Sequence, residues 1–128
     1  MPKWEDYKAE AKGRGALALE LFVIVTTPIA AQDVVRAALP AHLAYQRELE
    51  LSGQLVLAGP VSDDAGDNMQ GAGMIIYRAA SMEAARELAE ADPMHSAQAR
   101  SYTLRKWLIN EGSLNVSIGL STGRASLT

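Results

Sequence analysis

The sequence contains no cysteine. This absence excludes disulfide bonds, thiolate nucleophiles and cysteine-based zinc sites. The net charge is small as well, because 12 basic and 15 acidic residues leave only −3. No basic cluster is present of the kind that binds the phosphates of a nucleic acid. We therefore expect no nucleic-acid partner.

Long apolar runs are also lacking. The most apolar stretch, "LFVIV" at residues 21–25, is far shorter than the roughly 20 residues that a membrane-spanning helix requires. The opening residues, "MPKWEDYKAEAKGRG", mix acids and bases without an apolar centre, unlike a secretory signal peptide. These features predict a soluble, cytoplasmic protein with no membrane partner.

The pattern of apolar and turn-forming residues predicts one α+β domain. In chain order we expect helix 2–12, strand 16–27, helix 33–52, strands 54–61 and 72–79, helix 82–91, and strands 101–109 and 114–120. Asp33 is the candidate cap of the long helix, and Ser81 that of helix 82–91. Pro40 should kink or divide the long helix, so that its firm part covers residues 41–52.

The middle six elements follow the order β-α-β-β-α-β, which predicts a ferredoxin-like antiparallel sheet with two helices on one face. The domain thus comprises a helical extension (1–14), a ferredoxin-like core (16–110) and a C-terminal strand and tail (111–128). The strand segments "LFVIV", "LVL" and "MIIY" are apolar at consecutive positions, so both sheet faces need cover. Because helices cover only one face, we expect a homodimer that covers the other.

Two residues stand out as candidates for chemistry. On a helix, His42 shares a stripe with Leu39, Leu43 and Gln46, which places an imidazole among apolar side chains. It is either a partly buried structural histidine or a general acid or base. Asp92 precedes a proline and suits the cap of a new turn, or a carboxylate that orients an imidazole. The two roles of the aspartate are compatible.

Other kinds of site find no support in the sequence. The chain has two histidines, but neither an H-x-x-x-H nor an H-x-H spacing, and we expect no metal site. The segment "GPVSDDAGDNMQGAG" matches neither a phosphate-binding loop nor an EF-hand. No nucleophile elbow accompanies a Ser-His-Asp set. We therefore expect no cofactor.

The segments "LPAHLAYQRELELSGQLVLAGPVSDD" and "GAGMIIYRAASMEAARELAEADPMHSAQARSYTLRKWLINEGSL" resemble the YciI-like (YCII-related) family over about residues 20–115. The resemblance implies a ferredoxin-like protomer and a dimer of the α+β barrel type, akin to muconolactone isomerases. It also implies a pocket with a histidine, matched by His42, and an aspartate, matched by Asp92. Many members carry an aromatic residue after Asp-Pro, where this chain has Met94 and then His95.

The functional hypothesis that follows is a small cofactor-free enzyme of unassigned substrate. His42 would transfer a proton and Asp92 would hold its tautomer, in isomerase, lyase or dehydrochlorinase-type chemistry on a small cyclic or aromatic compound. The alternative is a non-catalytic module that binds a small ligand or another protein domain. In either case we expect a small-molecule pocket lined by Tyr45, Pro60, Met94, His95 and Tyr102.

Overall fold

The computed structural model describes all residues, 1–128, and divides into two compact units. One unit is the continuous segment Glu20–Trp107. The other combines Met1–Leu19 with Leu108–Thr128.

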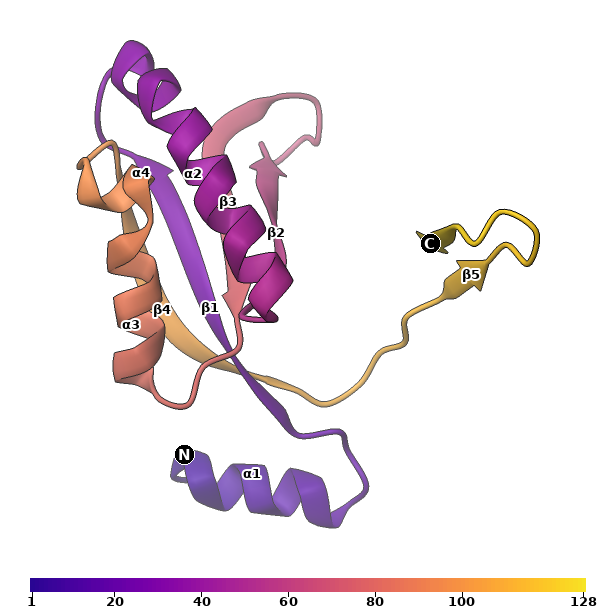
Figure 1. Ribbon diagram of the computed structural model, residues 1–128. Helices are drawn as coiled ribbons and strands as arrows, with labels where there is room; N and C mark the ends of the chain where they lie inside the picture. Colours follow the sequence, from indigo (N-terminus) through magenta and orange to yellow (C-terminus); the bar gives the residue numbers. More distant parts are fainter. The chain divides into compact units, whose positions relative to one another are not determined.

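The larger unit is built on a four-stranded antiparallel sheet with strand order β2-β3-β1-β4 (Figure 1). The strands are β1 (Leu19–Pro28), β2 (Leu55–Ser62), β3 (Met69–Tyr77) and β4 (Arg100–Ile109). Helices α2 (Gln32–Ser52) and α3 (Met82–Ala91) lie on the same face of the sheet (Figure 1). This is the predicted ferredoxin-like arrangement.

The core lies between the sheet and these two helices. Strands β1 and β3 pair so that Phe22 lies beside Tyr77 and Ile24 beside Ile75. Side chains alternate between the faces of a strand, so these four point toward the helices, where they are almost completely buried. Each apolar side chain buried in this way stabilises the fold by about 1.5–3 kcal/mol. Ala89 of α3 joins this cluster, and its small side chain lets the helix approach the sheet closely.

The opposite face of the sheet is also apolar. Val25 pairs with Met74, and Leu57 pairs with Ile76. Val25, Leu57 and Met74 remain 41%, 56% and 36% exposed, and Trp107 of β4 is 44% exposed. The prediction of apolar residues on both faces is confirmed for these strands. Whether a second copy covers the open face stays a prediction.

Helix α2 differs from the expectation. It continues through Pro40 as one helix, so a division at this residue is wrong, whereas a kink there stays a prediction. A proline removes one backbone donor and crowds the preceding turn, but the Pro40 side chain lies on the exposed side of the helix. Packing of Leu49 on the core holds the helix despite that cost. Asp33 is not the cap either, since Ala31 precedes the helix without a side-chain hydrogen bond.

Both ends of α3 lie where the sequence predicted them. The Ser81 hydroxyl accepts a hydrogen bond from the Ala84 amide at 3.0 Å, which begins α3 at the predicted residue. Asp92 then ends α3 and caps the short helix α4 (Pro93–Ser96). Proline suits the first position of a helix because its missing N–H would have no partner there. The predicted caps Ser81 and Asp92 are confirmed.

The smaller unit contains helix α1 (Trp4–Gly13) and a hairpin of β5 (Val116–Ile118) and β6 (Ala125–Leu127). The predicted strand 114–120 is therefore shorter than expected. It pairs with β6, a strand of only three residues that was not predicted from the sequence. The two form a separate sheet. None of the helices in the chain is both long and apolar enough to cross a membrane.

Candidate functional site

His42 and Asp92 meet at the contact between α2 and the start of α4. Their side chains are 50 residues apart in sequence, yet Nδ1 of His42 lies 2.8 Å from Oδ1 and 2.9 Å from Oδ2 of Asp92. The Asp92 side chain is completely buried, and that of His42 is 15% exposed. A short contact to both oxygens of a buried carboxylate fixes the position of the imidazole ring.

Asp92 serves its own backbone as well. Its Oδ1 accepts a hydrogen bond from the Met94 amide at 2.9 Å, which is the cap of α4. The carboxylate therefore caps a helix and contacts an imidazole at the same time. The two readings of this aspartate that the sequence left open are both present in the geometry.

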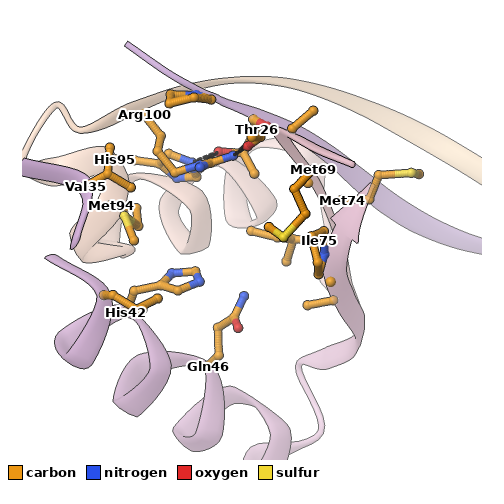
Figure 2. A pocket seen from close by; sticks show the side chains of 18 of the residues that line it. Thr26, Val35, His42, Gln46, Met69, Met74, Ile75, Met94, His95 and Arg100 are labelled. Atoms are coloured by element: carbon orange, nitrogen blue, oxygen red, sulfur yellow. Dashed lines mark hydrogen bonds between the residues drawn. The ribbon is translucent and has the colours of Figure 1, made fainter. Parts of the chain in front are cut away.

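The contact also determines the tautomer of the neutral imidazole. An ionised carboxylate only accepts hydrogen bonds, so Nδ1 of His42 must be the donor. The lone pair of the neutral ring is then on Nε2, for which the protein provides no hydrogen-bond partner. The ring projects from α2 toward a cavity, beside the Gln46 amide one turn farther along the helix (Figure 2). An unpaired Nε2 at a cavity is placed to accept a proton.

The cavity has a volume of about 900 Å³, within the range of small-molecule sites. Much of its wall is apolar or backbone, contributed by residues including Leu39, Leu43, Gly59, Met69, Gly73, Met74, Ile75 and Met94. Polar groups converge on it from His42, Gln46, Thr26, His95 and Arg100. Among the lining residues, Arg100 is the only one that is permanently charged.

A second polar cluster borders the same cavity. Nδ1 of His95 lies 2.8 Å from the Ala89 carbonyl, and Nε2 lies 3.0 Å from the Thr26 hydroxyl. A carbonyl only accepts, so Nδ1 donates, and in the neutral ring Nε2 accepts from Thr26. The Arg100 Nε donates to the same hydroxyl at 2.9 Å. Both ring nitrogens of His95 thus have hydrogen-bond partners within the protein. The centroid of the Tyr102 ring lies 4.7 Å from that of the His95 ring.

The predicted pocket residues separate into two groups. Pro60, Met94 and His95 line the cavity together with His42, whereas Tyr45 and Tyr102 are not among the lining residues. Both tyrosines pack against the hydrophobic core. Their hydroxyls donate to neighbouring acceptors, Tyr45 to the Leu88 carbonyl at 2.6 Å and Tyr102 to a Glu90 carboxylate oxygen at 2.5 Å. Burial raises the pKa of each, and neighbouring carboxylates add to the increase.

Sequence reasoning did not select Thr26 or Arg100 as site residues. Gln46 carried a signal, since it shares the helical stripe of His42. Thr26 and Arg100 had none, because a threonine within a strand and an arginine at the start of one are common in any sheet. Only the pairing of distant strands brings the two together.

A ferredoxin-like α+β protein with a histidine–aspartate pair beside a cavity of about 900 Å³ is thus the class that the fold and the site define. Residues 21–108 match the family model of the YCII-related domain, and the chain belongs to this family. The fold is similar to that of 5-chloro-2-hydroxyhydroquinone dehydrochlorinase (TftG) from Burkholderia phenoliruptrix AC1100, solved in complex with 2,5-dihydroxybenzoquinone. The TM-score is 0.52 with 21% sequence identity, over 68% of this chain and 92% of the other. The search of curated proteins finds no match.

Proposed function

We propose that the protein is a small cofactor-free enzyme that moves a proton on a small cyclic or aromatic compound. His42 is the general base and acid, and Asp92 is the residue that positions it. One observation carries the proposal: Nδ1 of His42 is held by both oxygens of the buried Asp92 carboxylate, while the ring borders the cavity. A base oriented by a buried carboxylate is a recurring arrangement for proton transfer.

The proposed reaction begins when Nε2 of His42 removes a proton from a substrate carbon next to an unsaturated carbon. The imidazole becomes an imidazolium, which the negative charge of Asp92 stabilises. The electron pair left on the carbon forms a new double bond. In an isomerisation, the electron pair of the original double bond moves to its far carbon, and Nε2 returns the proton there. In an elimination, a leaving group such as chloride departs with its bonding electrons, and Nε2 later releases the proton to water.

The name of the similar enzyme supports the elimination branch. That protein is a dehydrochlorinase of a chlorinated hydroquinone and was solved with a dihydroxybenzoquinone. Both compounds are small rings of the size that the present cavity admits. For this chain, we propose Pro60, Met94 and His95 as walls of the substrate site. Direct contact of Tyr45 or Tyr102 with a substrate stays a prediction, and their hydroxyls are already bonded within the protein.

The proposal includes a homodimer in the cytoplasm. The exposed apolar side chains on the open face of the sheet, Val25, Leu57, Met74 and Trp107, support the dimer because exposed apolar patches mark interaction surfaces. The cytoplasmic location is the expectation from the sequence. A small-molecule ligand is the partner that the cavity supports.

The test is a thermal-shift screen of small phenols, lactones and halogenated acids, followed by NMR of each hit in D₂O. We expect a compound that stabilises the protein and exchanges a carbon-bound proton for deuterium, and His42→Ala should abolish the exchange. Arg47→Ala is the matched control, since Arg47 is an exposed residue of α2 outside the cavity lining. Binding without exchange or turnover would favour the non-catalytic alternative. Exchange that persists in His42→Ala would refute the role of this residue.

A further inference from the structure

Arg100 is a cation at the cavity without an anionic partner. It is the first residue of β4 and is partly buried. Its guanidinium Nε donates to the Thr26 hydroxyl at 2.9 Å, and Nη2 donates to the Thr26 carbonyl at 3.0 Å and to the Gly71 carbonyl. All three acceptors are neutral, and Arg100 forms no ion pair. Arginines that are removed from water are usually paired with a carboxylate.

The bonding pattern leaves one end of the guanidinium unused. The group carries five N–H donors. Nε supplies one and Nη2 two, and these are the three donors that bind Thr26 and Gly71. Both N–H groups of Nη1 lack an acceptor in the protein. Arg100 is also one of the residues that line the cavity. The three bonds therefore hold the guanidinium rigidly and leave a pair of donors free for a ligand.

The electrostatics of the cavity point the same way. No aspartate, glutamate or lysine is among the lining residues, so Arg100 is the only fixed charge there. Burial lowers the pKa of Arg100, and the negative charge of Asp92 only partly opposes this. That carboxylate is engaged with His42 and the Met94 amide. The charge of Arg100 is not neutralised by any direct contact.

We infer that the ligand of this cavity is a small organic anion, and that Nη1 of Arg100 binds its carboxylate or ionised hydroxyl oxygen. The inference rests on the proposed function for the identity of the site and adds the substrate class. An anionic group on Arg100 would neutralise this partly buried charge, and it would orient the rest of the ligand in the cavity that His42 borders. Figure 2 shows Arg100 beside Thr26 and His95, with His42 on the same cavity. Charge-assisted hydrogen bonds of this kind are among the stronger polar contacts in proteins.

The test compares two probes of nearly equal shape, 4-hydroxybenzoate and 4-hydroxybenzamide, which differ in charge. Binding to the full chain is measured by NMR titration. We expect the acid to bind at least about tenfold more tightly than the amide, as hydrogen bonds to charged groups suggest. Added salt should weaken the binding of the acid and leave the binding of the amide unchanged. Equal binding of the two probes by the unmodified protein would overturn the inference without any mutation.

Variants assign the preference to Arg100. Arg100→Gln should abolish it, whereas Arg36→Gln should retain it, because Arg36 is an exposed arginine of α2 outside the cavity lining. If Arg100→Gln unfolds, Arg100→Lys is used instead. It keeps the charge but lacks the planar fork that binds Thr26 and Gly71, so we expect weaker binding of the acid with some preference left. An acid preference unchanged in the folded variant would refute the assignment.

His42→Ala separates this inference from the proposed function. It should bind the acid with the same preference over the amide, because Arg100 is intact, while losing deuterium exchange. If His42→Ala loses deuterium exchange but neither the unmodified protein nor any variant prefers the acid, His42 remains the base and the anion subsite is refuted. An acid preference that depends on Arg100, without exchange in the unmodified protein, would support the subsite and refute catalysis.

Discussion

Replacing Asp92 by asparagine should separate its structural role from its role at His42. In the native protein the carboxylate accepts hydrogen bonds from the Met94 amide and from Nδ1 of His42. The asparagine oxygen at the position of Oδ1 can keep the contact to Met94 and stays 2.8 Å from Nδ1, but the NH₂ group then stands at the position of Oδ2, 2.9 Å from the same nitrogen. The NH₂ group repels an Nδ1–H and can donate to an unprotonated Nδ1, so we expect the tautomer equilibrium to shift toward Nε2–H. The base at the cavity would then carry a proton.

The two effects have different magnitudes. Asparagine caps helices about as well as aspartate, so the free energy of unfolding should change by less than about 1 kcal/mol in Asp92→Asn. Asp92→Ala removes the cap, at about 1 kcal/mol. It also leaves Nδ1 of His42 without an acceptor, at about 1–3 kcal/mol, and creates a void at a completely buried position. We expect Asp92→Ala to lose about 3 kcal/mol. Activity should fall by about 10²–10⁴-fold in both.

The assay needs no substrate for its main result. Urea denaturation gives the two stabilities, and long-range ¹H–¹⁵N NMR correlations report which ring nitrogen of His42 carries the proton. The prediction is an Nδ1–H imidazole in the native protein and Nε2–H in Asp92→Asn. If Asp92→Asn keeps the native tautomer, or loses as much stability as Asp92→Ala, the division of roles between cap and orienting group is incorrect.

Four further predictions concern two tyrosines, the proline within α2 and the open face of the sheet. The Tyr77 hydroxyl is buried without a partner, so Tyr77→Phe should keep or raise stability by about 1 kcal/mol, whereas Tyr45→Phe, which loses the bond to Leu88, should lower it by a similar amount. Burial also raises the pKa of Tyr77. The folded chain therefore holds this proton more tightly than the unfolded chain, and stability should decline as pH rises above about 10; Tyr77→Phe should reduce that decline in alkaline denaturation, and an identical decline would contradict it. Pro40→Ala should raise the free energy of unfolding by up to about 3 kcal/mol, and with it the melting temperature, because it restores a backbone donor to the helix. A lower melting temperature would show that the proline ring makes a stabilising contact. Light scattering at micromolar concentration should give twice the mass of one chain, and Val25→Asp on the open sheet face should give a monomer; a monomeric native protein would refute the dimer.

Features that depend on neighbours in the sequence could be predicted from the sequence alone. The helix Met82–Ala91 and its Ser81 cap follow from residues within one turn of each other, and so does the Asp92–Pro93 start of α4. The order of strands and helices, with apolar residues at consecutive strand positions, was enough for the ferredoxin-like fold. Such features arise from short-range hydrogen bonds and from the period of side chains along each element.

The site depended on the tertiary structure. His42 and Asp92 were recognised as candidates, but only the packing of α2 beside α4 places Nδ1 at 2.8 Å from the carboxylate. Tyr45 was expected in the pocket, yet its hydroxyl is directed to the Leu88 carbonyl.

Arg100 had no local signal at all, and its position at the cavity results from the pairing of β4 with β1. Pro40 shows the same limit, because local chemistry predicted a kink or a division, and core packing keeps the helix undivided. Contacts between residues far apart in sequence depend on how whole elements pack, and the energy of that packing exceeds the local preferences that can be read along the chain.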